Sequence, residues 1–77
     1  MKELIEYIAK SIVNEPDQVV VSEEDTDNGK ILKLQVAPDD KGRVIGRQGR
    51  VAQAMRTLLH VMVARSDTKE KVELEIV

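Results

Sequence analysis

Hydrophobic residues near the start of the chain recur at helical spacing, with polar residues between them. The apolar positions are Leu4, Ile5, Ile8 and Ile12. This pattern predicts an amphipathic helix over residues 2–14, which ends before Pro16 because the residue preceding a proline resists helical angles. A second amphipathic helix is expected to follow Gly49 and to end near residue 65. Its predicted buried face comprises Val51, Ala52, Met55, Leu58, Leu59 and Met62.

Three short segments have the composition of β-strands. Residues 19–21 are consecutive valines, and apolar and polar residues alternate over residues 32–36 and 72–76. Asn28-Gly29 lies between the first two strands and predicts a hairpin, because a type I′ turn needs positive φ at both central positions.

The register of this hairpin stays open at the level of sequence. A two-residue turn at residues 28–29 places Glu23 opposite Leu34. The next pair on that face, Asp25 and Leu32, joins an acidic residue to an apolar one in the same way. Either the tip of the hairpin extends beyond the core, or the loop is longer than two residues.

The predicted element order is α-β-β-α-α-β in one domain, residues 1–77. The fourth element is a short helix ending near Ile45, with Asp39 and Asp40 expected to cap its first turn. Because two helices join the second and third strands, these strands can lie parallel in a three-stranded mixed sheet. All helices are expected on the apolar face of this sheet, which gives a two-layer α+β domain. The opposite face carries Lys33, Gln35, Glu73 and Glu75.

Acidic and basic residues are segregated along the chain. The net charge is −2, but residues 41–66 contain six basic residues and no acidic residue, a charge of +6. Residues 1–40 carry −6 and residues 67–77 carry −2. This segregation suggests a local anion-binding surface, although a solvated helix face without a partner produces the same pattern. The basic residues of the segment are Lys41, Arg43, Arg47, Arg50, Arg56 and Arg65.

Composition excludes several functional classes. The chain has no cysteine, so it forms no disulfide and no thiolate metal site. Its longest apolar stretch, residues 61–64, is far shorter than the roughly 18 residues of a membrane span. No signal-peptide pattern opens the chain, so a cytoplasmic protein without membrane association is expected. Tyr7 is the only Phe, Trp or Tyr, which disfavours base recognition by stacking.

Catalytic and metal-binding patterns are also missing. His60, the only histidine, is predicted on the polar face of its helix, with no carboxylate one turn away to complete a metal site. Asp39-Asp40 is interpreted as a pair of helix caps rather than paired catalytic carboxylates. No nucleophile stands at a recognisable spacing from a base. The sequence therefore predicts a binding protein rather than an enzyme, without a cofactor or metal.

One motif points to phosphate chemistry. Gly46-Arg47-Gln48-Gly49 stands between two predicted helices, and glycines let a ligand approach the backbone closely. The following helix presents free N–H groups and the positive end of its dipole, which favour a phosphate, and Arg47 adds charge-assisted contacts. Alternatively, Gly46 ends one helix and Gly49 permits the turn into the next, with no ligand involved.

The element order and the segment DDKGRVIGRQGR, residues 39–50, resemble a type II KH domain. The segment is most similar to small stand-alone bacterial KH proteins of the KhpA type, and the resemblance covers the whole chain. It implies binding of single-stranded RNA or DNA, with the GxxG loop gripping the backbone of about four nucleotides. It further implies a post-transcriptional regulator or RNA chaperone of low specificity.

The resemblance also implies a set of RNA-binding residues. Residues 46–49 correspond to the clamp, Ile45 to the floor of the groove, and the helix from Arg50 to one wall. Arg65 and Lys69 fall in the variable loop before the last strand. The complete set is Arg43, Ile45, Gly46, Arg47, Gln48, Gly49, Arg50, Arg65 and Lys69.

Binding through one such groove is expected to be weak and sensitive to salt, because it rests mainly on phosphate contacts. Ala52 stands where many KH domains have a bulky aliphatic residue, three positions after the second glycine. Multivalency would raise the affinity. The resemblance implies a homodimer, and pairing with a larger RNA-binding protein of the Jag/KhpB type.

Two other functions remain open on the sequence. Two helices joined by a short glycine turn also describe a helix-turn-helix, which reads duplex DNA. A protein-interaction module, whose partner alone binds the RNA, is the other alternative.

Overall fold

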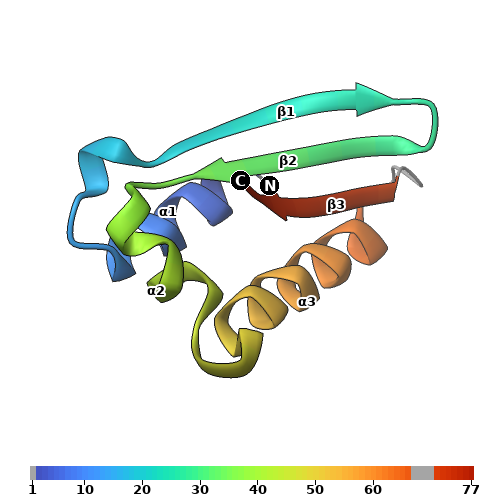
Figure 1. Cartoon of the computed structure of the whole chain (residues 1–77). Coiled ribbons are helices and arrows are strands. Elements are labelled where there is room, and N and C mark those ends of the chain that lie inside the picture. The colour runs from blue at the N-terminus through green and yellow to red at the C-terminus, as the bar shows by residue number, and fades with distance from the viewer. Residues whose placement is uncertain (1, 67–70) are drawn as a thin grey trace.

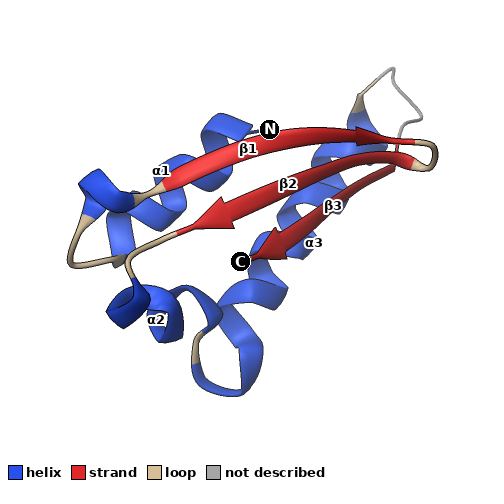
Figure 2. Ribbon diagram, turned by 45° about the horizontal axis from the view of Figure 1, so that its top comes forward, coloured by secondary structure: helices blue, strands red, loops and turns tan. Residues whose placement is uncertain are grey.

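The chain folds into two layers, a three-stranded sheet with all helices on one of its faces. The computed structural model describes residues 2–66 and 71–77. Figures 1 and 2 show α1 and α3 crossing beneath the sheet, with α2 at one end. The elements are α1 (Lys2–Ile12), β1 (Val20–Thr26), β2 (Gly29–Gln35), α2 (Lys41–Ile45), α3 (Arg50–Arg65) and β3 (Lys71–Ile76). The predicted order α-β-β-α-α-β and the α+β class are confirmed.

The sheet has the strand order β1-β2-β3, with β2 in the centre. β1 pairs with β2 antiparallel, and β3 pairs with β2 parallel, as the two-helix crossover predicts. At Gly29, β2 and β3 approach so closely that a Cβ there would overlap the carbonyl oxygen of Lys71. A glycine is therefore needed where β2 begins beside β3.

The core lies between the sheet and the helices. Leu32 and Leu34 of β2 and Leu74 of β3 are almost completely buried, as are Ile5 of α1 and Leu59 of α3. These side chains are joined in one apolar cluster, so the alternating strands and the helical stripes meet in the layer that the sequence predicts.

The β1-β2 hairpin differs from the prediction in its turn. Thr26 pairs with Gly29, so the loop residues are 27 and 28 and neither has positive φ. The predicted type I′ turn at residues 28–29 is therefore wrong. The observed register pairs Val21 with Leu34, and both are buried, whereas a two-residue turn at residues 28–29 would have placed Glu23 opposite Leu34.

The acidic residues 23–25 belong to β1. After Val21 every residue of β1 is exposed, so the hairpin tip extends beyond the core, as one of the two alternatives proposed. The loop between Thr26 and Gly29 is held by the Thr26 hydroxyl, which donates to the Gly29 carbonyl (3.0 Å) and accepts from the Asn28 N–H (3.3 Å).

Two predicted helix features are also corrected. The first helix ends at Ile12 rather than at residue 14. In α3, Leu58 (44% exposed) and Met62 (37% exposed) lie outside the buried face, although both were predicted in it. Helical spacing defined a broad apolar arc, and the sheet covers only the part that contains Ala52, Met55 and Leu59.

The face of the sheet opposite the helices is polar, as predicted. Lys33 forms an ion pair with Glu24 across the β1-β2 pair, with Nζ 2.6 Å from Oε2. The hydrogen bond that the Lys33 ammonium donates to the Glu24 carboxylate, the negative charge of Glu24 and the smaller effect of the Glu75 charge raise the pKa of Lys33 above its ordinary value. This face therefore includes at least one exposed ion pair between neighbouring strands.

Candidate nucleic-acid interface

The GxxG loop has a backbone that favours glycine. Gly46 (φ 78°), Gln48 (φ 58°) and Gly49 (φ 75°) all have positive φ. At Gly46 a Cβ would also lie 2.5 Å from Cγ2 of Val51, so a larger residue is excluded both by backbone angle and by space. At Gly49 a Cβ would meet no atom within 4 Å, and the backbone there is open to a ligand.

The loop ends α2 and starts α3 in four residues. The Gly46 N–H donates to the Gly42 carbonyl (2.9 Å), which closes α2, and the Gly49 N–H donates to the Gly46 carbonyl (3.1 Å). No side chain caps the N-terminus of α3. The Arg50 N–H donates to the Arg47 carbonyl, and the N–H groups that follow it in this 16-residue helix lie beside the loop together with the positive end of the helix dipole. This end of α3 favours an anion, which is what the motif predicts.

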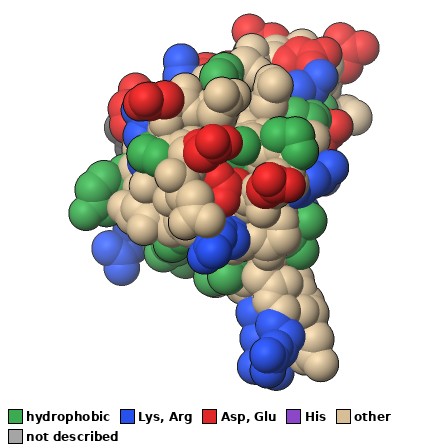
Figure 3. Space-filling model, turned by 60° about the vertical axis from the view of Figure 1, so that its left-hand side comes forward, with side chains coloured by type: hydrophobic (Ala, Val, Ile, Leu, Met, Phe, Trp, Pro, Cys, Tyr) green, Lys and Arg blue, Asp and Glu red, His purple; other side chains and the backbone are tan. Residues whose placement is uncertain are grey.

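Basic side chains surround the loop. Arg47, Gln48 and Arg50 are exposed, and the Arg50 guanidinium donates to Oε1 of Gln48 (Nη2 to Oε1, 3.3 Å). Arg43 of α2 is exposed, and its Nε lies 3.6 Å from Oδ1 of Asp40. Figure 3 shows basic and no acidic side chains at the tip of a lobe that projects from the body, whereas the body carries acidic and basic side chains together. The positive charge is thus concentrated where the backbone is open.

Asp40 does not cap α2, which corrects the prediction for this residue. Its side chain is buried, and its two oxygens accept the backbone N–H groups of Asn14 and Glu15, each at 3.0 Å. The carboxylate thereby joins the start of α2 to the segment after α1. Since α2 ends directly at the GxxG loop, this contact helps to position the loop.

The remaining predicted site residues lie at different distances from the loop. Ile45, the last residue of α2, is half-buried beside Gly46. Arg65 is exposed at the opposite end of α3, which at 16 residues is roughly 24 Å long. Lys69 lies outside the described residues. The structure therefore places most predicted contacts around one loop, and leaves Arg65 far from it.

A cavity between α3 and β3 was not predicted. It has a volume of about 310 Å³ and is lined by His60, Val63, Ala64, Lys71, Val72 and Glu73. The alternation in residues 72–76 identified the apolar side of β3. It did not indicate that α3 lies beside the outer edge of that strand, because this depends on packing between distant segments.

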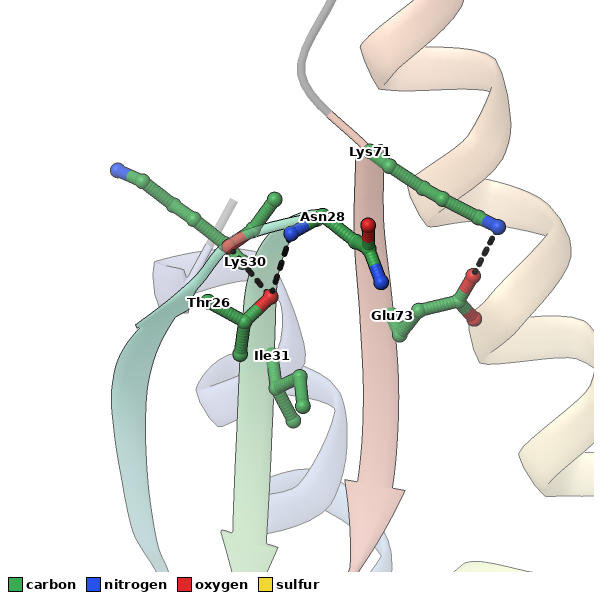
Figure 4. Close-up of a pocket in the computed structure, with 7 residues that line it drawn as sticks. Thr26, Asn28, Lys30, Ile31, Lys71 and Glu73 are labelled. Carbon is green, nitrogen blue, oxygen red and sulfur yellow. Dashed lines mark hydrogen bonds and ion pairs between the residues drawn. The ribbon is translucent and has the colours of Figure 1, made fainter.

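A smaller cavity of about 190 Å³ lies near the hairpin turn. In Figure 4, Thr26, Asn28 and Ile31 belong to the hairpin side of this cavity, while Lys71 and Glu73 point over the outer edge of β3. The ammonium of Lys71 lies 3.9 Å from the carboxylate of Glu73.

Within residues 2–66 and 71–77, no cluster of three or more His, Asp or Glu side chains could hold a metal ion. No helix in the described part of the chain is both long enough and apolar enough to cross a membrane.

The three-stranded mixed sheet, the helices on one face and the GxxG loop between α2 and α3 define a type II KH domain. The family model described as the KH domain of KhpA/KhpB matches residues 2–76. The chain therefore belongs to the KhpA/KhpB family of KH domains, and it is a KhpA-type protein.

Curated relatives match the chain over nearly its whole length. It is 47% identical over 74 residues to the RNA-binding protein KhpA of Clostridium acetobutylicum, which covers 96% of this chain and 99% of the relative. The protein of the same name from Caldanaerobacter subterraneus is 48% identical over 77 residues, with full coverage of both chains. That from Listeria monocytogenes is 46% identical over 96% of this chain and 97% of its own. No solved structure matches the chain.

Proposed function

We propose that this protein binds single-stranded RNA and clamps its backbone at residues 46–49. The observation that carries the proposal is the open, positively charged GxxG loop at the uncapped start of α3. The relatives carry the name RNA-binding protein KhpA, which supports RNA as the ligand. The protein would act in the cytoplasm as a post-transcriptional regulator or RNA chaperone of low sequence specificity.

The distribution of charge supports weak binding at one site. The loop and its neighbours contribute arginines without any acid between residues 41 and 66, while the rest of the chain is acidic. A loop that grips about four nucleotides neutralises few phosphates. The acidic body would repel RNA elsewhere, so binding would be confined to the loop and the adjoining groove.

A salt titration with competitors tests this proposal. With three or four phosphates neutralised, the affinity for a short single-stranded RNA should fall roughly 15- to 60-fold between 50 and 200 mM salt. Unlabelled single-stranded RNA should displace the labelled strand, and a DNA duplex of equal length should compete poorly. An affinity independent of salt contradicts a phosphate clamp, and stronger competition by the duplex supports the helix-turn-helix alternative instead.

We further infer that the protein acts as a dimer, or as a pair with a larger RNA-binding protein of the Jag/KhpB type. Leu58, Val61 and Met62 are exposed, and their spacing places them on one flank of α3. Contiguous apolar surface of this kind is typical of protein interfaces. The matching family model describes KhpA and KhpB domains together, which is in keeping with pairing of the two. When two grooves are linked, binding of an RNA to one groove raises the effective concentration of that RNA at the other groove.

Leu58→Glu is expected to convert a homodimer into a monomer, because it buries an unpaired charge in the α3 interface. Sedimentation equilibrium measures the mass of each variant. Tyr7→Glu is the matched control, since Tyr7 is 73% exposed on a different helix, α1, and its variant should keep the association state of the parent. A monomeric parent protein, or a dimeric Leu58→Glu variant, contradicts self-association through α3. Pairing with the larger Jag/KhpB-type protein would then be tested by mixing the two proteins.

A further inference from the structure

We infer that His60 stacks on a nucleobase of the bound strand, in the cavity between α3 and β3. This inference rests on the proposed function and concerns the part of the strand beyond the GxxG loop. His60 is exposed and lines the cavity with Val63 and Ala64 of the same helix. Imidazole is one of the rings on which unstacked RNA bases lie, so His60 supplies a stacking surface on the helix that follows the GxxG loop.

The lining of the cavity suits a base better than a phosphate. Val63, Ala64 and Val72 provide apolar surface, and the charges of Lys71 and Glu73 balance each other. The GxxG loop, in contrast, contains Arg47 and no acidic residue, and Arg50 follows it directly. A phosphate would be attracted to the loop and repelled by the carboxylate of Glu73. Entry into the cavity costs a neutral planar base little free energy, because the base carries no charge.

The position of His60 along α3 fits a strand that is held at the loop. His60 stands eleven residues after Gly49, roughly 16 Å along the helix axis. A single strand gripped at residues 46–49 and running along α3 spans this distance within a few nucleotides. The side chains of Lys71 and Glu73, which point over the outer edge of β3 (Figure 4), border the same path.

The experiment compares two ligands of equal length, a single-stranded oligoribonucleotide and an abasic ribose-phosphate oligomer. His60→Ala should weaken binding of the base-bearing strand about fivefold or more, and leave binding of the abasic oligomer unchanged. The fold should tolerate the variant because the side chain is exposed. Tyr7→Ala is the matched control, since it removes an exposed ring from a different element and should change neither affinity.

A second variant reports on stacking directly. The chain has no tryptophan, so His60→Trp introduces a single indole whose fluorescence should be quenched by the base-bearing strand and not by the abasic oligomer. Equal weakening of both ligands by His60→Ala means that His60 contacts the backbone, which overturns the inference. Unchanged binding by His60→Ala, while Arg47→Asp weakens binding of both ligands, also overturns the inference and leaves the clamp intact. If Arg47→Asp has no effect either, the proposed function itself fails.

Discussion

Replacing Arg47 and Gln48 together with aspartate is expected to weaken RNA binding roughly 30- to 150-fold. Hydrogen bonds that involve a charged group contribute about 1.5–3 kcal/mol each, and the substitution replaces attraction of the phosphate by repulsion. A loss of about 2–3 kcal/mol corresponds to that change in affinity. Both glycines stay in place, so the backbone of the loop is retained while its charge is reversed.

The double variant is expected to remain folded. Arg47 and Gln48 are exposed, and surface substitutions change the free energy of unfolding by about 0.5 kcal/mol or less. Gln48 has φ 58°, and aspartate adopts this left-handed conformation more readily than most residues. In the parent protein the Arg50 guanidinium donates to Oε1 of Gln48, and an aspartate carboxylate at position 48 can accept from the same guanidinium. Urea unfolding of the variant and the parent checks that the fold is intact.

A matched variant separates the local clamp from the total charge. Lys10→Asp with Gln18→Asp changes the net charge by the same amount, at two exposed positions away from the loop. Fluorescence anisotropy with a labelled RNA should show parent-like affinity for this control and the large loss for the loop variant. If both variants lose affinity equally, the effect is one of overall charge. If the loop variant binds like the parent, the RNA is held elsewhere or by a partner.

Much of the candidate site could be predicted because it is local in sequence. Gly46 and Gly49 mark the turn between two helices, and their positive φ follows from residue type. The positions of Arg47 and Arg50 beside the start of a helix could also be predicted, because they follow from the helix boundary alone. The positive φ of Gln48 was not predictable, since nothing in its residue type favours that conformation.

The parts that could not be predicted depend on contacts between distant segments. The apolar arc of α3 includes Leu58 and Met62, but only the packed sheet decides which part of that arc is buried. The hairpin turn was predicted from two residues, whereas burial of Val21 opposite Leu34 determines the register. The His60 cavity likewise exists only because α3 and the outer edge of β3 come together.

Asp40 shows how a tertiary contact overrides a local rule. An aspartate just before a helix usually caps it. Here its carboxylate instead accepts the N–H groups of Asn14 and Glu15, about 25 residues away, and is almost completely buried. These two donors follow the end of α1 and have no helical carbonyl to bond, so the carboxylate satisfies groups that would otherwise cost free energy.

Asp40→Ala is therefore expected to destabilise the fold by about 2–4 kcal/mol. Two hydrogen bonds to a charged acceptor are lost, and the N–H groups of Asn14 and Glu15 are left in a partly buried position. A chain of this length has a total stability of roughly 4–12 kcal/mol, so the loss is a large part of it. Urea unfolding, monitored by circular dichroism, measures the change as a shift in midpoint with an unchanged slope.

Asp39→Ala is the control for this prediction, because Asp39 is adjacent, carries the same charge and is exposed. It should change the free energy of unfolding by about 0.5 kcal/mol or less. Asp40→Asn should fall between the two, since an amide keeps one acceptor oxygen for one of the two N–H groups. Equal midpoints for Asp39→Ala and Asp40→Ala would show that the link between α2 and the segment after α1 contributes little. A large difference would mean that the placement of α2, and with it the GxxG loop, depends on a carboxylate that contacts no RNA.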